Sequence, residues 1–150
     1  MNDKKGAHEH YVRALALEEA DQRAAMSAYE ACLAGDCSHL EARINLGRLL
    51  HLEGMHAQAE SIYRDTQEAD ATLFFNLAVL MEESGRDAEA IKYYRQAIVH
   101  DPGFTDAHLN LSMLQEKRGE TQSAYRHLLA YHRLVEAHRN PADFGSDETD

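Results

Sequence analysis

Apolar residues recur along this chain at the spacing of helical faces, and the same spacing returns in successive segments. Midway along the chain, Phe74, Leu77 and Met81 lie three or four positions apart, and Ala90 and Tyr94 follow after a short polar break. Residues with this spacing share one face of an α-helix. The pattern therefore predicts a pair of amphipathic helices joined by a short turn.

This helical pattern recurs with a nearly constant period. Successive copies are 34, 31 and 34 residues apart, and three residue classes keep one register over four copies. A fixed period of this kind indicates a repeat architecture, in which each unit buries its apolar face against its neighbours. The three classes are small–large pairs (Ala25/Tyr29, Ala59/Tyr63, Ala90/Tyr94 and Ala124/Leu128), leading apolar residues (Val12, Leu46, Leu77 and Leu111) and turn glycines (Gly54, Gly85 and Gly119).

The pattern resembles the tetratricopeptide repeat (TPR), a helix–turn–helix unit of 34 residues. The clearest match has Phe74 at the large-aromatic position, Gly85 in the turn and Pro102 at the end of the unit. The resemblance implies an all-α fold, a right-handed α-solenoid of four TPR helix–turn–helix hairpins with about eight helices. It implies a single TPR domain over residues 1–140, with repeats at 6–39, 40–70, 71–104 and 105–138.

The second copy is three residues shorter than the others, and the missing residues lie near its end. We expect its second helix to lose almost one turn, with Asp70 starting the next helix directly. Two other helix starts are predicted from their polar residues: Ser38, which forms a capping box with Glu41, and Thr105.

Charge and composition narrow the possible partners and compartments. The 15 Lys and Arg residues against 26 Asp and Glu residues give a net charge of −11, which disfavours binding to nucleic acid or to an anionic membrane. No apolar run is long enough to span a bilayer, no signal peptide is expected, and two cysteines do not make a disulfide framework. We therefore predict a cytoplasmic protein, with residues 141–150 as an acidic disordered tail.

In TPR stacks the first helices of all units line a concave groove, and the resemblance assigns this role to the first helix of each copy. Asn45, Asn76 and Asn110 share one position of that helix, and an amide offers both a donor and an acceptor to the backbone of an extended peptide. The alternative is that these amides bond within their own stack. The predicted partner-binding residues are Asn45, Asn76, Asn110, Tyr11, Ile44, Arg48, Phe75, Val79, Leu109, Met113, Glu82 and Glu83.

Metal and catalytic chemistry find little support in the sequence. His51 and His56 are five residues apart, a poor spacing for two ligands on one helix. Cys32, Cys37 and His39 suggest part of a zinc site, but Cys32 takes the small-residue position of its unit, where a free thiol packs as an apolar group. The chain has no P-loop, dinucleotide-binding glycines or nucleophile elbow. We predict no enzyme activity, no cofactor and no metal.

These observations predict a non-catalytic protein–protein interaction module, a scaffold or adaptor that binds a partner segment in the concave TPR groove. Acidic residues outnumber basic ones there, so we expect a partner with apolar and basic residues and not the free carboxylate that TPR cochaperones hold. The alternative is a self-assembling TPR protein, or the TPR portion of a larger regulator, that docks through the stack ends. A homo-oligomer through the terminal helices would follow from Tyr125, Leu129 and His132, which share one face of the last helix.

Overall fold

The computed structural model describes residues 3–140, so the predicted tail at 141–150 lies outside the described residues. Over residues 3–140 the chain forms eight helices and no strand, which confirms the all-α prediction. The helices are α1 (Lys4–Leu17), α2 (Gln22–Gly35), α3 (Leu40–Leu52), α4 (His56–Arg64), α5 (Ala71–Glu83), α6 (Asp87–His100), α7 (Thr105–Lys117) and α8 (Thr121–Arg139).

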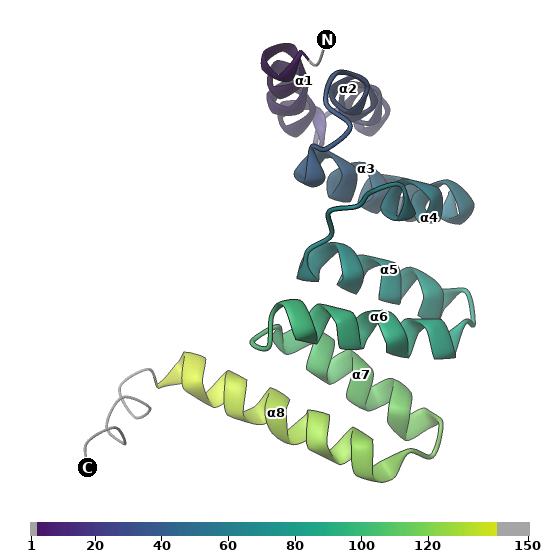
Figure 1. The fold of residues 1–150 in the computed structure, drawn as a ribbon, viewed down its shortest axis with the longest axis vertical. Coiled ribbons are helices and arrows are strands. Elements are labelled where there is room, and N and C mark those ends of the chain that lie inside the picture. The colour runs from purple at the N-terminus through teal and green to yellow at the C-terminus, as the bar shows by residue number, and fades with distance from the viewer. Residues whose placement is uncertain (1–2, 141–150) are drawn as a thin grey trace.

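Consecutive helices pair into four hairpins, α1/α2, α3/α4, α5/α6 and α7/α8, which follow one another along the long axis of the molecule (Figure 1). One buried apolar cluster extends from Ala7 in the first hairpin to Leu114 in the fourth. The core is therefore continuous through the stack, as expected for units that cannot bury their apolar faces alone.

Glycines end the first helix of three hairpins. Gly54, Gly85 and Gly119 have φ angles of +76°, +73° and +79°, a left-handed conformation that other residues rarely adopt. The first hairpin turns differently, because the amides of Ala20 and Asp21 both donate to the carbonyl of Leu17. The three predicted turn glycines are confirmed.

Small residues let the two helices of the first three hairpins approach closely, and a tyrosine fills the space one turn later. A Cβ atom at Gly47 would lie 2.2 Å from the ring of Tyr63, so only glycine fits opposite that ring. Tyr29, Tyr63 and Tyr94 are all fully buried. These tyrosines are therefore the largest side chains at the centre of the stack.

The second hairpin is shortened where the sequence predicted. Helix α4 has nine residues against 14 for α6, and Asp70 caps α5 by accepting a hydrogen bond of 2.9 Å from the amide of Leu73. The chain between Arg64 and Asp70 has no helix. A direct start of α5 at Asp70 is confirmed.

Two predicted helix starts are wrong. Helix α3 is capped by His39, whose Nδ1 accepts from the amide of Ala42 at 3.2 Å, because Ser38 instead donates its hydroxyl to Asp36 at 2.6 Å. Helix α7 has Phe104 at its N-cap, and Thr105 is already inside the first turn. In both cases the cap is displaced by one residue from the predicted position.

Candidate partner-binding face

We call the surface formed by the exposed sides of α1, α3, α5 and α7 the first-helix face. Asn45 in α3 donates from Nδ2 to the hydroxyl of Tyr29 at 3.1 Å, and Asn110 in α7 donates to the hydroxyl of Tyr94 at 3.3 Å. Each tyrosine belongs to the preceding hairpin. The side-chain amides at these two positions therefore bond within the stack, which is the alternative that the sequence left open.

Asn76, at the same position of α5, is less firmly held. It lies beside Tyr63, and the amide opposes the rise in the pKa of Tyr63 that burial produces. The geometry is not that of a formed hydrogen bond, and the Tyr63 hydroxyl is buried without a partner among the described residues. Among the three asparagines at this position, Asn76 is thus the one whose amide is freest to change partners.

The tyrosine hydroxyls connect the amides to carboxylates on the same face. Tyr94 donates to Glu82 at 2.7 Å, and Tyr29 donates to Glu18. Burial, followed by these carboxylates, raises the pKa of both tyrosines. Both hydroxyls therefore keep their protons and act as donors at neutral pH.

Ion pairs join successive first helices. Arg48 in α3 contacts Glu18, the residue after α1, at 2.6 Å, and His51 in α3 contacts Glu83 at the end of α5. Arg48 and Glu83, which the resemblance assigned to one face, therefore take part in a row of contacts that runs from α1 to α5. Arg48, the basic residue expected in the groove, is already paired with a carboxylate.

The apolar residues of the first-helix face differ in how much surface they offer. Ile44 is only 9% exposed and belongs to the core, so a partner could scarcely reach it, whereas Met113 is 59% exposed. Phe75 is half-buried, with its ring 4.8 Å from Phe104 and 5.8 Å from Tyr94 between ring centroids. Val79 and Leu109 are also half-buried.

Tyr11 takes the asparagine position in α1 and is half-buried. Its ring lies 4.6 Å from that of His39 and 6.1 Å from that of Tyr29 between centroids. Burial, and then the nearby carboxylates of Glu41 and Glu18, raise the pKa of Tyr11. Tyr11 therefore presents an aromatic edge and a neutral hydroxyl at the N-terminal end of the face.

The sequence profile of the tetratricopeptide repeat family matches residues 71–104, the stretch that the sequence pattern assigned to the third copy. Residues 71–104 of this chain are a tetratricopeptide repeat. The TPR repeat-containing thioredoxin TTL4 of Arabidopsis thaliana is 30% identical over 98 residues, which cover 63% of this chain and 14% of that protein. The TPR chain thus matches a small part of the length of that relative.

Solved structures share the TPR fold at low sequence identity. PilF of Pseudomonas aeruginosa superposes with a TM-score of 0.80 at 18% identity, over 87% of this chain and 62% of that one. YrrB, described as a TPR protein with an unusual peptide-binding site, superposes with a TM-score of 0.75 at 18% identity, over 91% and 72% of the two chains. The TPR family is one of generally non-catalytic protein–protein interaction scaffolds.

Four charged residues that the sequence pattern did not reveal meet on the second and third hairpins of the TPR stack. We call them the ionic cluster: Glu60, Arg64, Arg86 and Glu89. Arg86 donates to Glu60 and Glu89 at 2.8 Å, and Arg64 donates to the same two carboxylates at 2.8 and 3.1 Å. Hydrogen bonds from Arg86 lower the pKa of Glu89. Burial alone would raise the pKa of Glu60, but hydrogen bonds from both arginines outweigh it and lower that pKa. No sequence period signals such a cluster.

Arg43 is a further residue whose role the repeat pattern did not reveal. It takes the position of Phe74 in its own hairpin and is 3% exposed, yet it carries a charge. Its guanidinium donates to the carbonyl of Cys37 at 2.7 Å and to that of Ile62 at 3.0 Å. Arg43 thus ties α3 to the chain on either side of it.

The ends of the TPR stack are the alternative docking surfaces. In α8, Tyr125 is 61% exposed, and Leu129, His132 and Val135 are exposed as well. In α1, Val12 is exposed on the opposite end of the stack. Between residues 3 and 140 no helix has the length and apolar character needed to cross a membrane.

Proposed function

We propose that this TPR protein is a scaffold or adaptor that binds a segment of a partner protein on the first-helix face. The observation that carries the proposal is the set of side-chain contacts that join successive first helices. Glu18 pairs with Arg48 between α1 and α3, His51 pairs with Glu83 between α3 and α5, and Tyr94 bonds both Glu82 of α5 and Asn110 of α7. A partner lying along this face would meet one continuous surface.

The charges of the first-helix face determine which partner segments are complementary to it. Arg48 is paired with Glu18, and Lys117 lies 3.5 Å from Asp87, so both basic side chains are already compensated. The carboxylates of Glu82 and Glu83 lie on the same face. A segment with Lys or Arg beside apolar anchors is complementary to this surface, whereas a free carboxylate would be repelled.

The contacts of a bound segment follow from the exposed groups. Met113 and the half-buried Phe75 would receive apolar side chains, and the oxygen of Asn76 would accept from a backbone amide. The similarity in fold to YrrB, a protein described with a peptide-binding site, supports a peptide-binding mode.

The test is a selection of binders from a library of peptides that combine Lys or Arg with apolar residues, followed by affinity measurement on variants. Asn76→Ala should weaken a selected peptide by about 2- to 12-fold, the equivalent of one hydrogen bond of about 0.5–1.5 kcal/mol. Phe75→Ala should weaken it at least as much, because buried aromatic side chains tend to be interface hot spots.

Tyr125→Ala in α8 is the matched control, since it removes an exposed aromatic side chain from the stack end. Affinity that ignores Asn76 and Phe75 but falls with Tyr125→Ala would contradict the first-helix face as the binding site. It would favour the second candidate function, docking or self-association through α8, whose exposed Tyr125, Leu129 and Val135 support it. Light scattering at several protein concentrations would then separate self-association from capture of a different protein.

A further inference from the structure

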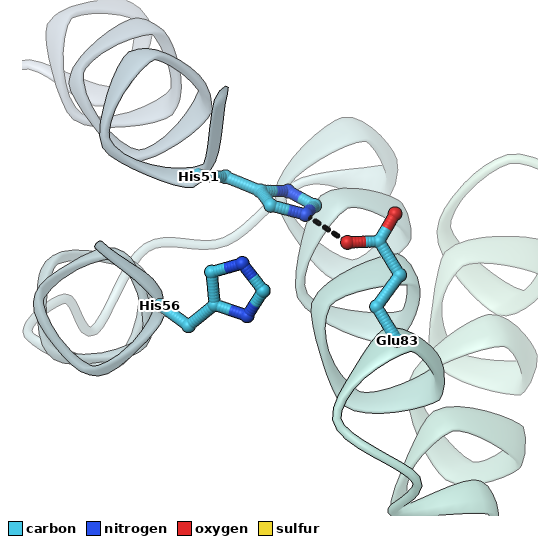
Figure 2. A group of neighbouring side chains, drawn as sticks. All are labelled: His51, His56 and Glu83. Atoms are coloured by element: carbon cyan, nitrogen blue, oxygen red, sulfur yellow. Dashed lines mark hydrogen bonds and ion pairs between the residues drawn. The ribbon is translucent and has the colours of Figure 1, made fainter. Parts of the chain in front are cut away.

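Two histidines and a glutamate from three helices meet on the second and third hairpins (Figure 2). His51 lies near the end of α3, His56 is the first residue of α4, and Glu83 is the last residue of α5. One ligand atom from each, an imidazole nitrogen or a carboxylate oxygen, lies within 4.8 Å of the other two. The rings of His51 and His56 stand edge to face, with 5.2 Å between their centroids.

The sequence spacing gave the wrong geometry for this pair. Five positions along one helix would send His51 and His56 in different directions, but the turn at Gly54 ends α3 before α4 begins. The two histidines therefore face each other across the turn of a hairpin. The third group, Glu83, comes from the next hairpin and is 32 residues away in sequence from His51.

His56 distinguishes this arrangement from an ordinary ion pair. His51 and Glu83 already contact each other, which satisfies both groups without a third. Within the described part of the chain, His56 forms no side-chain hydrogen bond, and Figure 2 shows its ring turned toward the gap beside His51 and Glu83. An imidazole placed there, without a polar partner of its own, completes a set of three ligands.

We propose that His51, His56 and Glu83 form a binding site for a divalent transition-metal ion of the Zn²⁺ class, with water in the remaining position. Two imidazole nitrogens and one carboxylate oxygen are a ligand set that suits Zn²⁺, and Mg²⁺ or Ca²⁺ would prefer oxygen ligands. Bonds of about 2.0–2.2 Å place tetrahedral ligands about 3.4 Å apart, so the groups must adjust by about an ångström or more. The Glu83 side chain is 52% exposed and has the freedom to do so.

A metal ion at this site would connect two hairpins of the stack. His51 and His56 belong to the second hairpin and Glu83 to the third, so a bound ion would link the two hairpins directly. The second hairpin contains α4, the shortest second helix of the stack. The contact between α4 and α5 is correspondingly smaller than the contact between α6 and α7. Metal binding should therefore slow amide hydrogen exchange in α4 and α5 more than in α7 and α8.

The experiment is a titration of the full chain with Zn²⁺ at pH 7.5, measured by calorimetry and by ¹⁵N NMR of the histidine side chains. We expect one Zn²⁺ per chain, with the ring-nitrogen signals of His51 and His56 shifting together. His56→Gln and Glu83→Gln should each weaken affinity at least about tenfold, because even the loss of an outer-shell group costs 10- to 100-fold. Mg²⁺ should produce neither the heat nor the shifts.

Two variants serve as matched controls. His138→Gln removes an exposed histidine from α8, and Cys37→Ser removes an exposed thiol that could itself bind Zn²⁺. Both should bind Zn²⁺ as the unaltered chain does. The proposal is overturned if the unaltered chain binds no Zn²⁺ below 1 mM, if His56→Gln and Glu83→Gln bind it unchanged, or if binding is lost with Cys37→Ser.

Discussion

The junction between the third and fourth hairpins and the junction between the second and third are built from the same repeat but held by different forces. At the former, α6 has 14 residues, and the buried hydroxyl of Tyr94 bonds both Asn110 and Glu82. At the latter, α4 has nine residues, and the equivalent hydroxyl of Tyr63 is buried without a partner among residues 3–140. The second–third junction therefore has both a shorter second helix and fewer hydrogen bonds at its buried tyrosine.

Charged groups occupy the place of the missing contacts. The ionic cluster places Glu60 and Arg64 of α4 against Arg86 and Glu89 of the third hairpin, and Arg64 also donates to the hydroxyl of Tyr93 at 2.8 Å. These side chains are partly exposed, so water and salt weaken their attraction. The second–third junction should therefore be the more easily opened of the two.

The largest effect should come from Tyr94→Ala, which empties the buried space of a full aromatic ring at the third–fourth junction. We expect a loss of about 3–5 kcal/mol in the free energy of unfolding, as for other buried aromatic residues. Tyr63→Ala should cost about 1 kcal/mol less, because its hydroxyl has no hydrogen bond to lose within the described part of the chain. Denaturant unfolding of the two variants measures the difference.

Hydrogen exchange decides whether the Tyr94→Ala effect spreads. The core is continuous, so exchange should accelerate in α7 and α8 as well as in α5 and α6. Acceleration confined to residues 71–104 would contradict the continuous core. Equal losses for Tyr63→Ala and Tyr94→Ala would remove the distinction between the two junctions.

A smaller effect is expected from Arg43→Met, which removes the buried guanidinium that ties down the shortened hairpin. The carbonyls of Cys37 and Ile62 would lose their charged donors, at a cost of about 2–3 kcal/mol in the free energy of unfolding. Exchange should accelerate in α4 and in the chain that follows it. Arg118→Met is the control, because Arg118 is exposed and forms a surface pair with Glu120. It should change stability by less than about 0.5 kcal/mol. Equal losses in both variants would contradict the role of Arg43.

The sequence predicted the features that recur, and it missed those that occur once. The helices and the three turn glycines within residues 3–140 follow from residue classes at fixed positions of the repeat. The shortened α4 follows from the one short repeat, so the period reveals all of them. The ionic cluster depends on long side chains that reach between hairpins, and Arg43 on one that reaches backbone carbonyls before and after α3, and no period records either. His56 was missed for a different reason, because helical spacing does not hold across the turn at Gly54.

The asparagines of the first-helix face also show what a repeat period cannot predict. Sequence position placed Asn45 and Asn110 on equivalent faces, but it could not say which amide atom points inward, because that depends on the tyrosine hydroxyl of the preceding hairpin. Ile44 was placed among the exposed apolar residues by the resemblance, and close packing of α3 buries it instead. Whether a partner uses this face is decided by the peptide experiment and not by either pattern.

The smallest effect, and the one that distinguishes the two junctions without a mutation, is their response to acid. Burial, then the charges of His108, Arg95 and Arg126, lower the pKa of His127 in α8 below its usual 6.5. The unfolded chain therefore binds this proton first, so stability is lost as the pH falls below about 6.5. At the second–third junction the lowered pKa values of Glu60 and Glu89 act at more acid pH, because their contribution is present above about 4.3 and lost only below it.

Amide exchange between pH 7 and 4, corrected for the intrinsic rate, should therefore rise first in α8 and only later in α4. His127→Gln should remove the first step and leave the second, since the glutamine cannot take up a proton. A single acid transition that affects α4 and α8 together, or a first step that survives His127→Gln, would show that the two junctions do not respond to acid separately. Independent steps would mean that pH alone can loosen the C-terminal end of the stack while the ionic cluster still holds the second hairpin to the third.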